Sequence, residues 1–297
     1  MISIVICSAN ANDLRLVSRN IEQTIGVPFE IISFDNSDGK KGICELYNIG
    51  RKKAQYDIIC FMHEDIRIDT PEWGKLVLDK FAGSAEIGVV GVAGGGYKSL
   101  TPSGWYCLEY KSVDRYFQNL LQGFKLDDKD EILAYHNPYE QKISEVICVD
   151  GLWFCARKEI LDKKPFDEDL LKGFHGYDID FCLNIYGKHK IVVVYDVLMK
   201  HASEGNFNSS WLNEILKVHR KWTKSLPLTI SNVADIELYD TEKEALKNLV
   251  EQMLEWNYSF FQIQRMLFTV GKSGKMPLRL FFKGYVHLME QKFGIGK

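Results

Sequence analysis

Three short polar clusters in this sequence contain residue types that could bind a charged ligand or move a proton. They span residues 35–39, 63–65 and 174–180. In the second cluster, His63, Glu64 and Asp65 come directly after an apolar run at residues 58–62. Adjacent carboxylates repel each other and lose solvation at the end of a buried strand, so a cation or a ligand is their expected counterpart.

The other two clusters also have simpler explanations, which the residues alone leave open. Residues 35–39, with the sequence Asp-Asn-Ser-Asp-Gly, have the composition of an ordinary turn. Asp178 and Asp180 open a predicted helix, where acidic side chains favour the helix dipole. The three clusters together favour a binding site over three unrelated structural features.

Four apolar runs rich in β-branched residues predict the strands that would position these clusters. They cover residues 2–7, 29–34, 58–62 and 87–92. Segments with helical spacing lie between them, and this alternation is typical of a parallel α/β sheet. Ligands bind at the carboxyl ends of the strands in such sheets, where the polar clusters are expected. A later apolar run at residues 191–195 predicts another interior strand.

The rest of the chain departs from this alternation. Residues 97–150 mix aromatic and charged residues without a clear period, which predicts an insertion or a long active-site loop. Near the C-terminus, helices are predicted over residues 211–222, 242–256 and 277–293. We therefore predict an α/β domain at residues 1–207 and a helical C-terminal extension at residues 208–297.

Composition and charge exclude several classes of protein. The chain has 297 residues and a net charge of −3, so it has no overall field to hold a nucleic acid. No secretory signal is seen, and the seven cysteines form no CxxC pair, which favours a reducing, cytoplasmic location. The glycines at 91–96 miss the dinucleotide-binding pattern. The segment GKSGK at 271–275 is not a phosphate loop, because Met266 stands where that pattern needs its first glycine.

In their order along the chain, several motifs resemble family 2 glycosyltransferases of the GT-A fold. They are SFDNSDG at 33–39, ICELYNIGRKKAQYDIICFMHEDI at 43–66, VDGLWFCARKEIL at 149–161, FDEDL at 166–170, GFHGYDIDFC at 173–182 and KHAS at 200–203. The resemblance covers about residues 1–207. It is greatest to a bacterial branch whose metal motif reads His-Asp-Asp, where this chain has His63, Glu64 and Asp65.

The resemblance implies a pocket for a nucleotide-diphosphate sugar. Asp35 would accept a hydrogen bond from the base or ribose, and Asp150 would border the donor sugar. Trp153 would stack on a sugar ring, with a place in the core as the alternative. The other residues implied for the pocket are Asn36, Ser37, Asn48, Glu64 and Gly151.

The resemblance also implies a metal site and a catalytic base. Asp65 would hold Mn²⁺ or Mg²⁺ against the diphosphate, with His63 or Glu64 assisting, because oxygen ligands suit these ions. His201 resembles a third protein ligand, and an imidazole ligand favours Mn²⁺. Inverting transfer needs one carboxylate to deprotonate the acceptor; Asp178 is expected in this role, and Asp180 is the alternative.

These expectations describe a metal-dependent, inverting glycosyltransferase of polysaccharide biosynthesis that acts on a glycan or lipid-linked acceptor. Two alternatives remain: a GT-A-like binding protein without turnover, and a nucleotidyltransferase. The latter should carry a glycine-rich basic loop after the first strand, and residues 8–13 offer none. Basic and apolar residues alternate at 270–297, which suits peripheral contact with a membrane or, equally, packing on the α/β domain.

Overall fold

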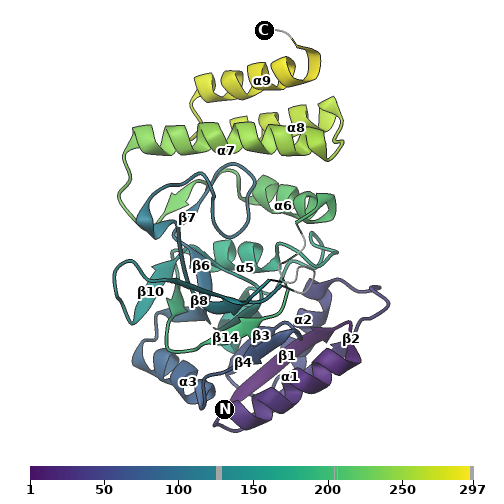
Figure 1. Ribbon diagram of the computed structural model, residues 1–297, viewed down its shortest axis with the longest axis vertical. Coiled ribbons are helices and arrows are strands. Elements are labelled where there is room, and N and C mark those ends of the chain that lie inside the picture. The colour runs from purple at the N-terminus through teal and green to yellow at the C-terminus, as the bar shows by residue number, and fades with distance from the viewer. Residues whose placement is uncertain (125–128, 204, 206, 295–297) are drawn as a thin grey trace.

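A computed structural model describes residues 1–124, 129–203, 205 and 207–294 (Figure 1). Its centre is a seven-stranded mixed sheet. The strands, in order across the sheet, are β10 (Ile143–Val146), β13 (Lys190–Val194), β5 (Ile87–Gly91), β12 (Trp153–Arg157), β3 (Ile58–Met62), β1 (Ile2–Ser8) and β2 (Phe29–Asp35). β1 is parallel to β2 and β3, whereas β12 is antiparallel to both of its neighbours. The interior position predicted for residues 191–195 is confirmed by β13.

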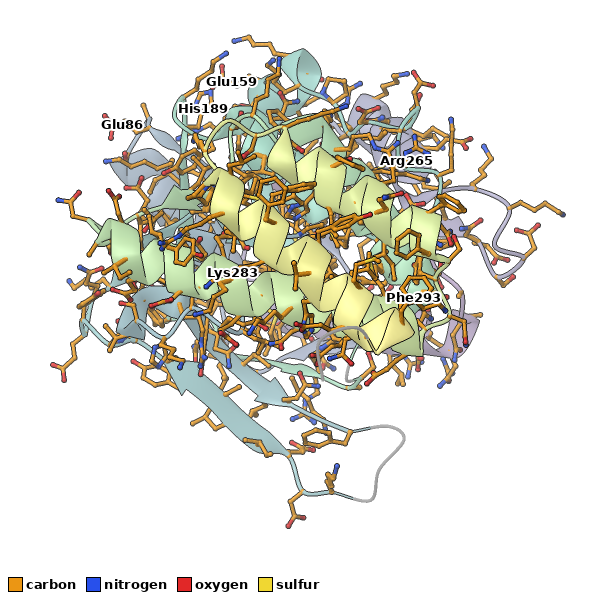
Figure 2. All side chains as sticks on the ribbon, turned by 90° about the horizontal axis from the view of Figure 1, so that it is seen from above. Glu86, Glu159, His189, Arg265, Lys283 and Phe293 are labelled. Atoms are coloured by element: carbon orange, nitrogen blue, oxygen red, sulfur yellow. The ribbon has the colours of Figure 1, made fainter. Side chains whose placement is uncertain are left out.

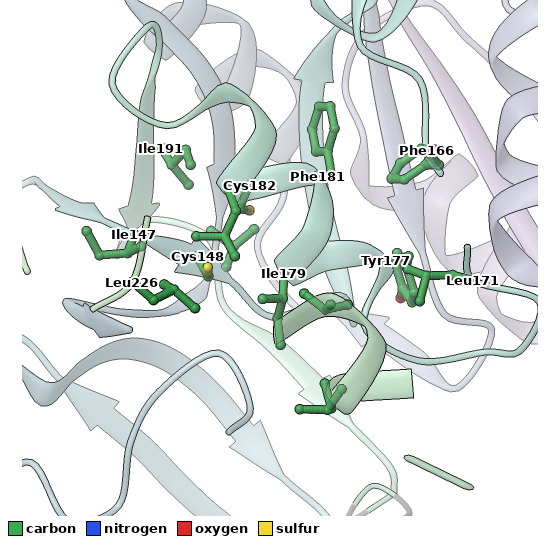
Figure 3. Packing of buried hydrophobic residues seen from close by; sticks show 14 of the residues in the cluster. Ile147, Cys148, Phe166, Leu171, Tyr177, Ile179, Phe181, Cys182, Ile191 and Leu226 are labelled. Carbon is green, nitrogen blue, oxygen red and sulfur yellow. The ribbon is translucent and has the colours of Figure 1, made fainter. Parts of the chain in front are cut away.

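Helices cover both faces of this sheet, which explains why its strands are apolar on both sides. Ile4 of β1 packs toward α1 (Ala11–Thr24) and α3 (Trp73–Gly83). Val5, the next residue, packs in the opposite core with α2 (Ile43–Lys53), α4 (Lys158–Lys163) and α5 (Tyr177–Ile185). In Figure 3, Cys182 of α5 lies near Cys148 in this second core.

A second sheet contains much of the segment that was expected to be irregular. Its strands are β11 (Cys148–Val149), β6 (Ala93–Gly95), β8 (Tyr116–Gln122), β14 (Met199–His201) and β4 (Ile66–Ile68), with β9 (Ile132–His136) paired to β8. A short 3-10 helix, Val113–Arg115, precedes β8. The interpretation of residues 97–150 as an insertion or a long active-site loop did not predict the strands β8 and β9; residues 125–128 lie outside the described residues. Polar side chains interrupt the apolar pattern of these two strands, so they have no continuous apolar run to identify them.

Four helices follow the α/β region: α6 (Ser209–Trp222), α7 (Asp235–Glu255), α8 (Phe260–Gly271) and α9 (Leu278–Phe293). The sequence analysis missed α8, although Ser259 and Gln262 form a capping box at its start. α7, α8 and α9 stack at one end of the molecule (Figure 1). None of the helices in the described part of the chain is long and apolar enough to cross a bilayer.

Several contacts cross the predicted boundary at residue 208, which itself stays a prediction. β15 (Leu228–Thr229) pairs with β7 (Tyr97–Lys98). Glu242 of α7 is buried and accepts hydrogen bonds from the loop that begins in β7. Its donors are the hydroxyls of Tyr97 (2.6 Å), Ser99 (2.9 Å) and Thr101 (2.9 Å) and the backbone N–H groups of Leu100 (2.8 Å) and Thr101 (3.0 Å). The helical extension thus fixes a loop of the α/β region.

Candidate active site

A cavity of about 600 Å³ opens at the carboxyl ends of β1 and β3. Ser8 ends β1 and His63 follows β3, and both residues line the cavity. The predicted site residues that line it are Asn36, His63, Glu64, Asp65, Asp150, Gly151, Asp178 and His201. The sheet therefore gathers residues from distant parts of the chain at the edge where the sequence predicted a ligand.

Two imidazoles and one carboxylate meet on one wall of this cavity. One ligand atom each from His63, Asp65 and His201 lies within 4.8 Å of the others, and His201 Nε2 is 3.7 Å from Asp65 Oδ1. Strand pairing produces this proximity, because β14 and β4 place His201 opposite Ile66, the residue after Asp65. This donor set and spacing fit a divalent cation such as Mn²⁺.

Tyr177 orients one of these imidazoles. Its hydroxyl donates to the carbonyl oxygen of Gly151 at 2.9 Å and lies 3.1 Å from His63 Nε2. Because the single hydroxyl proton is used on Gly151, the neutral tautomer of His63 that fits this arrangement donates its Nε2–H to the Tyr177 oxygen, which would leave the Nδ1 lone pair for a metal. Burial, reinforced by the neighbouring His201, lowers the pKa of His63, which favours the neutral form that binds metals.

Glu64, between the two predicted ligands, is held by a different part of the chain. Its carboxylate accepts hydrogen bonds from the backbone N–H groups of Ala9 (3.0 Å) and Asn10 (3.1 Å) and from the Ser8 hydroxyl. These residues form the turn between β1 and α1. Glu64 therefore fixes this turn at the rim of the cavity, while His63 and Asp65 on either side belong to the metal-type cluster.

Asp178 lies in the first turn of α5 and borders the cavity. The backbone N–H of Gly151 donates to its Oδ2 at 3.0 Å. Burial and the nearby charge of Asp150 raise the pKa of Asp178 to about 7. A carboxyl with this pKa exchanges its proton near neutral pH, which is the property needed in a general acid or base.

Gly151 is required by the close approach of Tyr177. A Cβ atom at position 151 would lie 2.4 Å from the Tyr177 hydroxyl oxygen, a distance that only glycine avoids. The same residue supplies the N–H for Asp178 and the carbonyl for Tyr177. The Gly151 backbone thus connects the carboxyl that could move a proton with the imidazole that could hold a metal.

Only some of the residues predicted to bind the nucleotide line the cavity. Asn36 lines the cavity and fixes its own loop through two hydrogen bonds with the backbone of Lys41 (2.8 and 3.2 Å). Asp35 and Ser37 are exposed beside it and do not line the cavity. Asn48 is buried away from the cavity, where it bonds to the backbone of Phe166 at 2.9 and 3.1 Å.

The expectations for Trp153 and Asp180 are corrected because both side chains are buried away from the cavity. Trp153 is 0% exposed and packs edge-on against Trp73, with ring centroids 5.8 Å apart, so it is a core residue and not a sugar platform. Asp180 points from α5 to α6, where it binds Lys221 Nζ (2.8 Å) and Trp222 Nε1 (2.7 Å). It does not line the cavity, which leaves Asp178 as the carboxylate of this motif that faces it.

Comparison with known protein families identifies the class. Residues 3–224, well over half of the chain, match the family described as "Glycosyltransferase like family". The chain belongs to the glycosyltransferase-like family. No curated protein sequence is significantly similar to it.

Solved structures extend the comparison to the fold. S. aureus TarS 1–349 in complex with UDP-GlcNAc is 11% identical, with a TM-score of 0.53 over 97% of this chain and 88% of that chain. GalNAc-T7 with UDP, GalNAc and Mn²⁺ is 10% identical, with a TM-score of 0.51 over 99% of this chain and 58% of that chain. At these identities the similarity concerns the fold alone, and it confirms the predicted GT-A α/β class.

This glycosyltransferase-like chain has further cavity residues that the sequence analysis did not identify. They include Trp105, Gln118, Gln122, Phe207 and Trp211. Phe207 and Trp211 contact each other edge-on at 5.2 Å and bring the start of α6 to the cavity. Trp105 and Gln118 come from the segment without a clear period. A high aromatic content in that segment was the only available signal, and it does not say which rings face a ligand.

Proposed function

We propose that this protein transfers a sugar from a nucleotide-diphosphate donor to a hydroxyl group of a glycan or lipid-linked acceptor, with inversion at the anomeric carbon. The observation that supports this most directly is the position of His63, Asp65 and His201 on the same cavity as Asp178. A cation-binding set beside a carboxyl with a raised pKa provides the two elements that inverting transfer requires.

The cation-binding set would act on the leaving group. His63, Asp65 and His201 would hold Mn²⁺ or Mg²⁺, which neutralises charge on the departing diphosphate when bound. Two imidazole ligands favour Mn²⁺. The chain prepares this set in advance, because Tyr177 fixes the His63 ring and the pairing of β14 with β4 fixes His201.

Asp178 would act on the acceptor. Its carboxylate takes the proton of the acceptor hydroxyl while that oxygen attacks the anomeric carbon, and the bond to the diphosphate breaks on the opposite face. The Gly151 N–H holds the carboxylate in place at 3.0 Å. A pKa of about 7 allows Asp178 to accept the proton and release it again at neutral pH.

The structural comparisons support the choice of donor. TarS is solved with UDP-GlcNAc, and GalNAc-T7 with UDP, GalNAc and Mn²⁺. We infer a donor of the same chemical class for this chain. Because sugar nucleotides are made in the cytoplasm, the proposal also locates the reaction there.

Calorimetry with UDP, GDP and dTDP, each with and without Mn²⁺, tests this proposal. We expect one nucleotide to bind in a Mn²⁺-dependent manner, and Asp65→Asn or His201→Ala to weaken that binding at least about tenfold. Asp69→Asn is the matched control, since Asp69 is a neighbouring carboxylate that pairs with Arg67 at 2.8 Å outside the cavity.

Equal nucleotide affinity with and without Mn²⁺, or equal losses in Asp65→Asn and Asp69→Asn, would contradict the metal site. If a nucleotide sugar binds yet is neither transferred to any of a broad set of acceptors nor slowly hydrolysed, the protein is a binding module and the proposed transfer is wrong.

A further inference from the structure

The C-terminal helices α8 and α9 present an unusual surface at the end of the molecule, which Figure 2 shows from above with Arg265, Lys283 and Phe293 labelled. We call it the α8–α9 face. Its exposed apolar and basic residues are Phe261, Arg265, Phe268, Lys272, Leu278, Arg279, Phe282, Lys283, Val286 and Phe293. Phe261 is 77% exposed and Leu278 is 71% exposed, so this face leaves large apolar side chains in water.

Ring contacts join the two helices into one apolar surface. At one end, Phe260 contacts both Phe261 (6.0 Å between centroids) and Phe293 (5.7 Å). At the other end, Phe281 contacts both Phe268 (5.3 Å) and Phe282 (5.7 Å). The exposed phenylalanines therefore belong to two clusters that each join α8 to α9, and they are not scattered single residues.

The segment that contains α8 and α9 has a net charge opposite in sign to that of the rest of the chain. Residues 259–297 contain seven basic residues and one acidic residue, Glu290, whereas the remainder contains 30 basic and 39 acidic residues. One of the seven, Lys297, lies outside the described residues; the other six are exposed. A strongly basic face on an otherwise acidic protein favours one orientation on a negatively charged surface.

A groove beside α8 concentrates this charge. It has a volume of about 600 Å³ and lies between the end of α6 and the outer side of α8. Its basic lining residues are Arg220, Lys224, Arg265 and Lys272, and no Asp or Glu is among the described residues that line it. Phe261 and Phe268 also line the groove. It therefore combines groups that attract phosphate with groups that enter an apolar phase.

We propose that the α8–α9 face, with this groove, docks the protein on an anionic phospholipid bilayer. Basic side chains attract the negative headgroups, and exposed phenylalanine and leucine side chains insert at the boundary between headgroups and acyl chains. A second copy of the chain is a poorer occupant, because two basic faces repel each other. This inference goes beyond the proposed transfer reaction and does not depend on it.

Co-sedimentation with lipid vesicles tests the proposal without any sugar nucleotide. The full chain should bind vesicles of phosphatidylcholine with phosphatidylglycerol, bind vesicles of phosphatidylcholine alone far more weakly, and dissociate as salt is raised. Each basic residue at an anionic surface contributes about fivefold in affinity, so Arg265→Glu with Lys272→Glu should weaken binding by at least about 25-fold.

Lys163→Glu with Lys188→Glu is the matched control, since both lysines are exposed in the α/β region and the change in net charge is identical.

Phe261→Ser with Phe268→Ser tests insertion of the apolar side chains into the bilayer. Both side chains are exposed, so the variant should fold, which circular dichroism checks. We expect this variant to bind anionic vesicles at least about tenfold more weakly than the parent.

Three results would overturn the proposal. The first is no binding of the parent to anionic vesicles at low salt. The second is equal loss of binding in the control and in the variant of Arg265 and Lys272. The third is a dimer, seen by light scattering, that the substitutions at Phe261 and Phe268 abolish, because the face would then be an interface between two copies.

Discussion

Asp178 and Glu242 are both carboxylates withdrawn from solvent, yet their surroundings are opposite. Glu242 accepts hydrogen bonds from three hydroxyls and two backbone N–H groups within 3.0 Å. Asp178 accepts from the Gly151 N–H at 3.0 Å and is close enough to Asp150 to feel its charge. Glu242 lies among hydrogen-bond donors, whereas Asp178 shares its cavity with the negative charge of Asp150.

This difference separates a structural carboxylate, Glu242, from Asp178, the carboxylate that we propose as the base. Hydroxyl and backbone N–H donors surround the Glu242 carboxylate, so Glu242 serves to fix the loop after β7. Burial and a like charge have the opposite effect on Asp178 and raise its pKa to about 7. Sites that perform chemistry commonly retain groups that are costly to the fold.

The largest effect is expected from Asp178→Asn on transfer. Asparagine has nearly the same shape but cannot serve as the base, so the rate should fall by ~10²–10⁴-fold, or about 3 to 5 kcal/mol of barrier. Donor affinity, measured by calorimetry, should stay within about twofold, because Asp178 acts on the acceptor. Turnover within a few-fold of the parent would eliminate Asp178 as the base.

Glu242→Ala should reduce the free energy of unfolding by about 3 kcal/mol, because it leaves buried hydroxyls and N–H groups without an acceptor. Denaturant unfolding measures this change. The control is Glu244→Ala on the same helix, where Glu244 is exposed and lies 3.5 Å from Lys243; we expect a change below about 0.5 kcal/mol there. Equal stabilities of the two variants would refute the structural role of Glu242.

Asp178→Asn should have the opposite effect on stability, by about 2 kcal/mol at pH 8; the full pKa shift corresponds to about 4 kcal/mol, but solvent screens part of the penalty at this half-buried side chain. The folded-state pKa of Asp178 is raised from 3.8 to about 7, so its ionisation penalises the folded state increasingly from about pH 4 to pH 7 and fully above that. Asparagine removes this penalty. Thermal unfolding at pH 8 should show the gain, and it should disappear near pH 4; a pH-independent difference would argue against a raised pKa.

The pH dependence of transfer should report the same group. Because the base must be deprotonated, the rate at saturating substrate should rise about tenfold per pH unit below its pKa and level off above about pH 7. Steady-state assays from pH 5 to pH 9 measure this limb. A rate that stays flat down to pH 5 would mean that Asp178 has an ordinary pKa in the working complex.

The smallest effect is expected at Asp35, which lies at the exposed end of β2. If it accepts one hydrogen bond from the base or ribose, Asp35→Ala should weaken nucleotide binding about fivefold, or about 1 kcal/mol. Asp38→Ala in the same exposed loop is the control. Identical affinities in the two variants would remove Asp35 from the site.

The sequence predicted those parts of the fold that bury continuous apolar runs. β1, β3 and β5 are buried on both faces, so their composition alone identifies them. β8 and β9 are interrupted by polar side chains and were missed for that reason. α8 was also missed, although Ser259 and Gln262 form a capping box at its start.

In the site, motifs predicted which segments meet but not which way each side chain points. His63, Asp65, Asp178 and His201 converge because strand ends and the start of α5 meet at one cavity. Asp180 follows Asp178 by two residues on the same helix, so it faces α6. Trp153 stands on β12, and the residue pattern did not reveal that its side chain enters the core beside Trp73.

Glu64 also bears on the order in which ligands enter the cavity. With Asn10 accepting from the N–H groups of Asn12 and Asp13, four backbone donors in the turn after β1 are occupied by the chain's own oxygens. Helix starts of this kind bind phosphate in many other α/β proteins, whereas here a diphosphate would meet a carboxylate. A cation that compensates the charge of this carboxylate would have to bind before the diphosphate. We therefore expect a compulsory kinetic order in which the cation binds before the nucleotide and leaves after it.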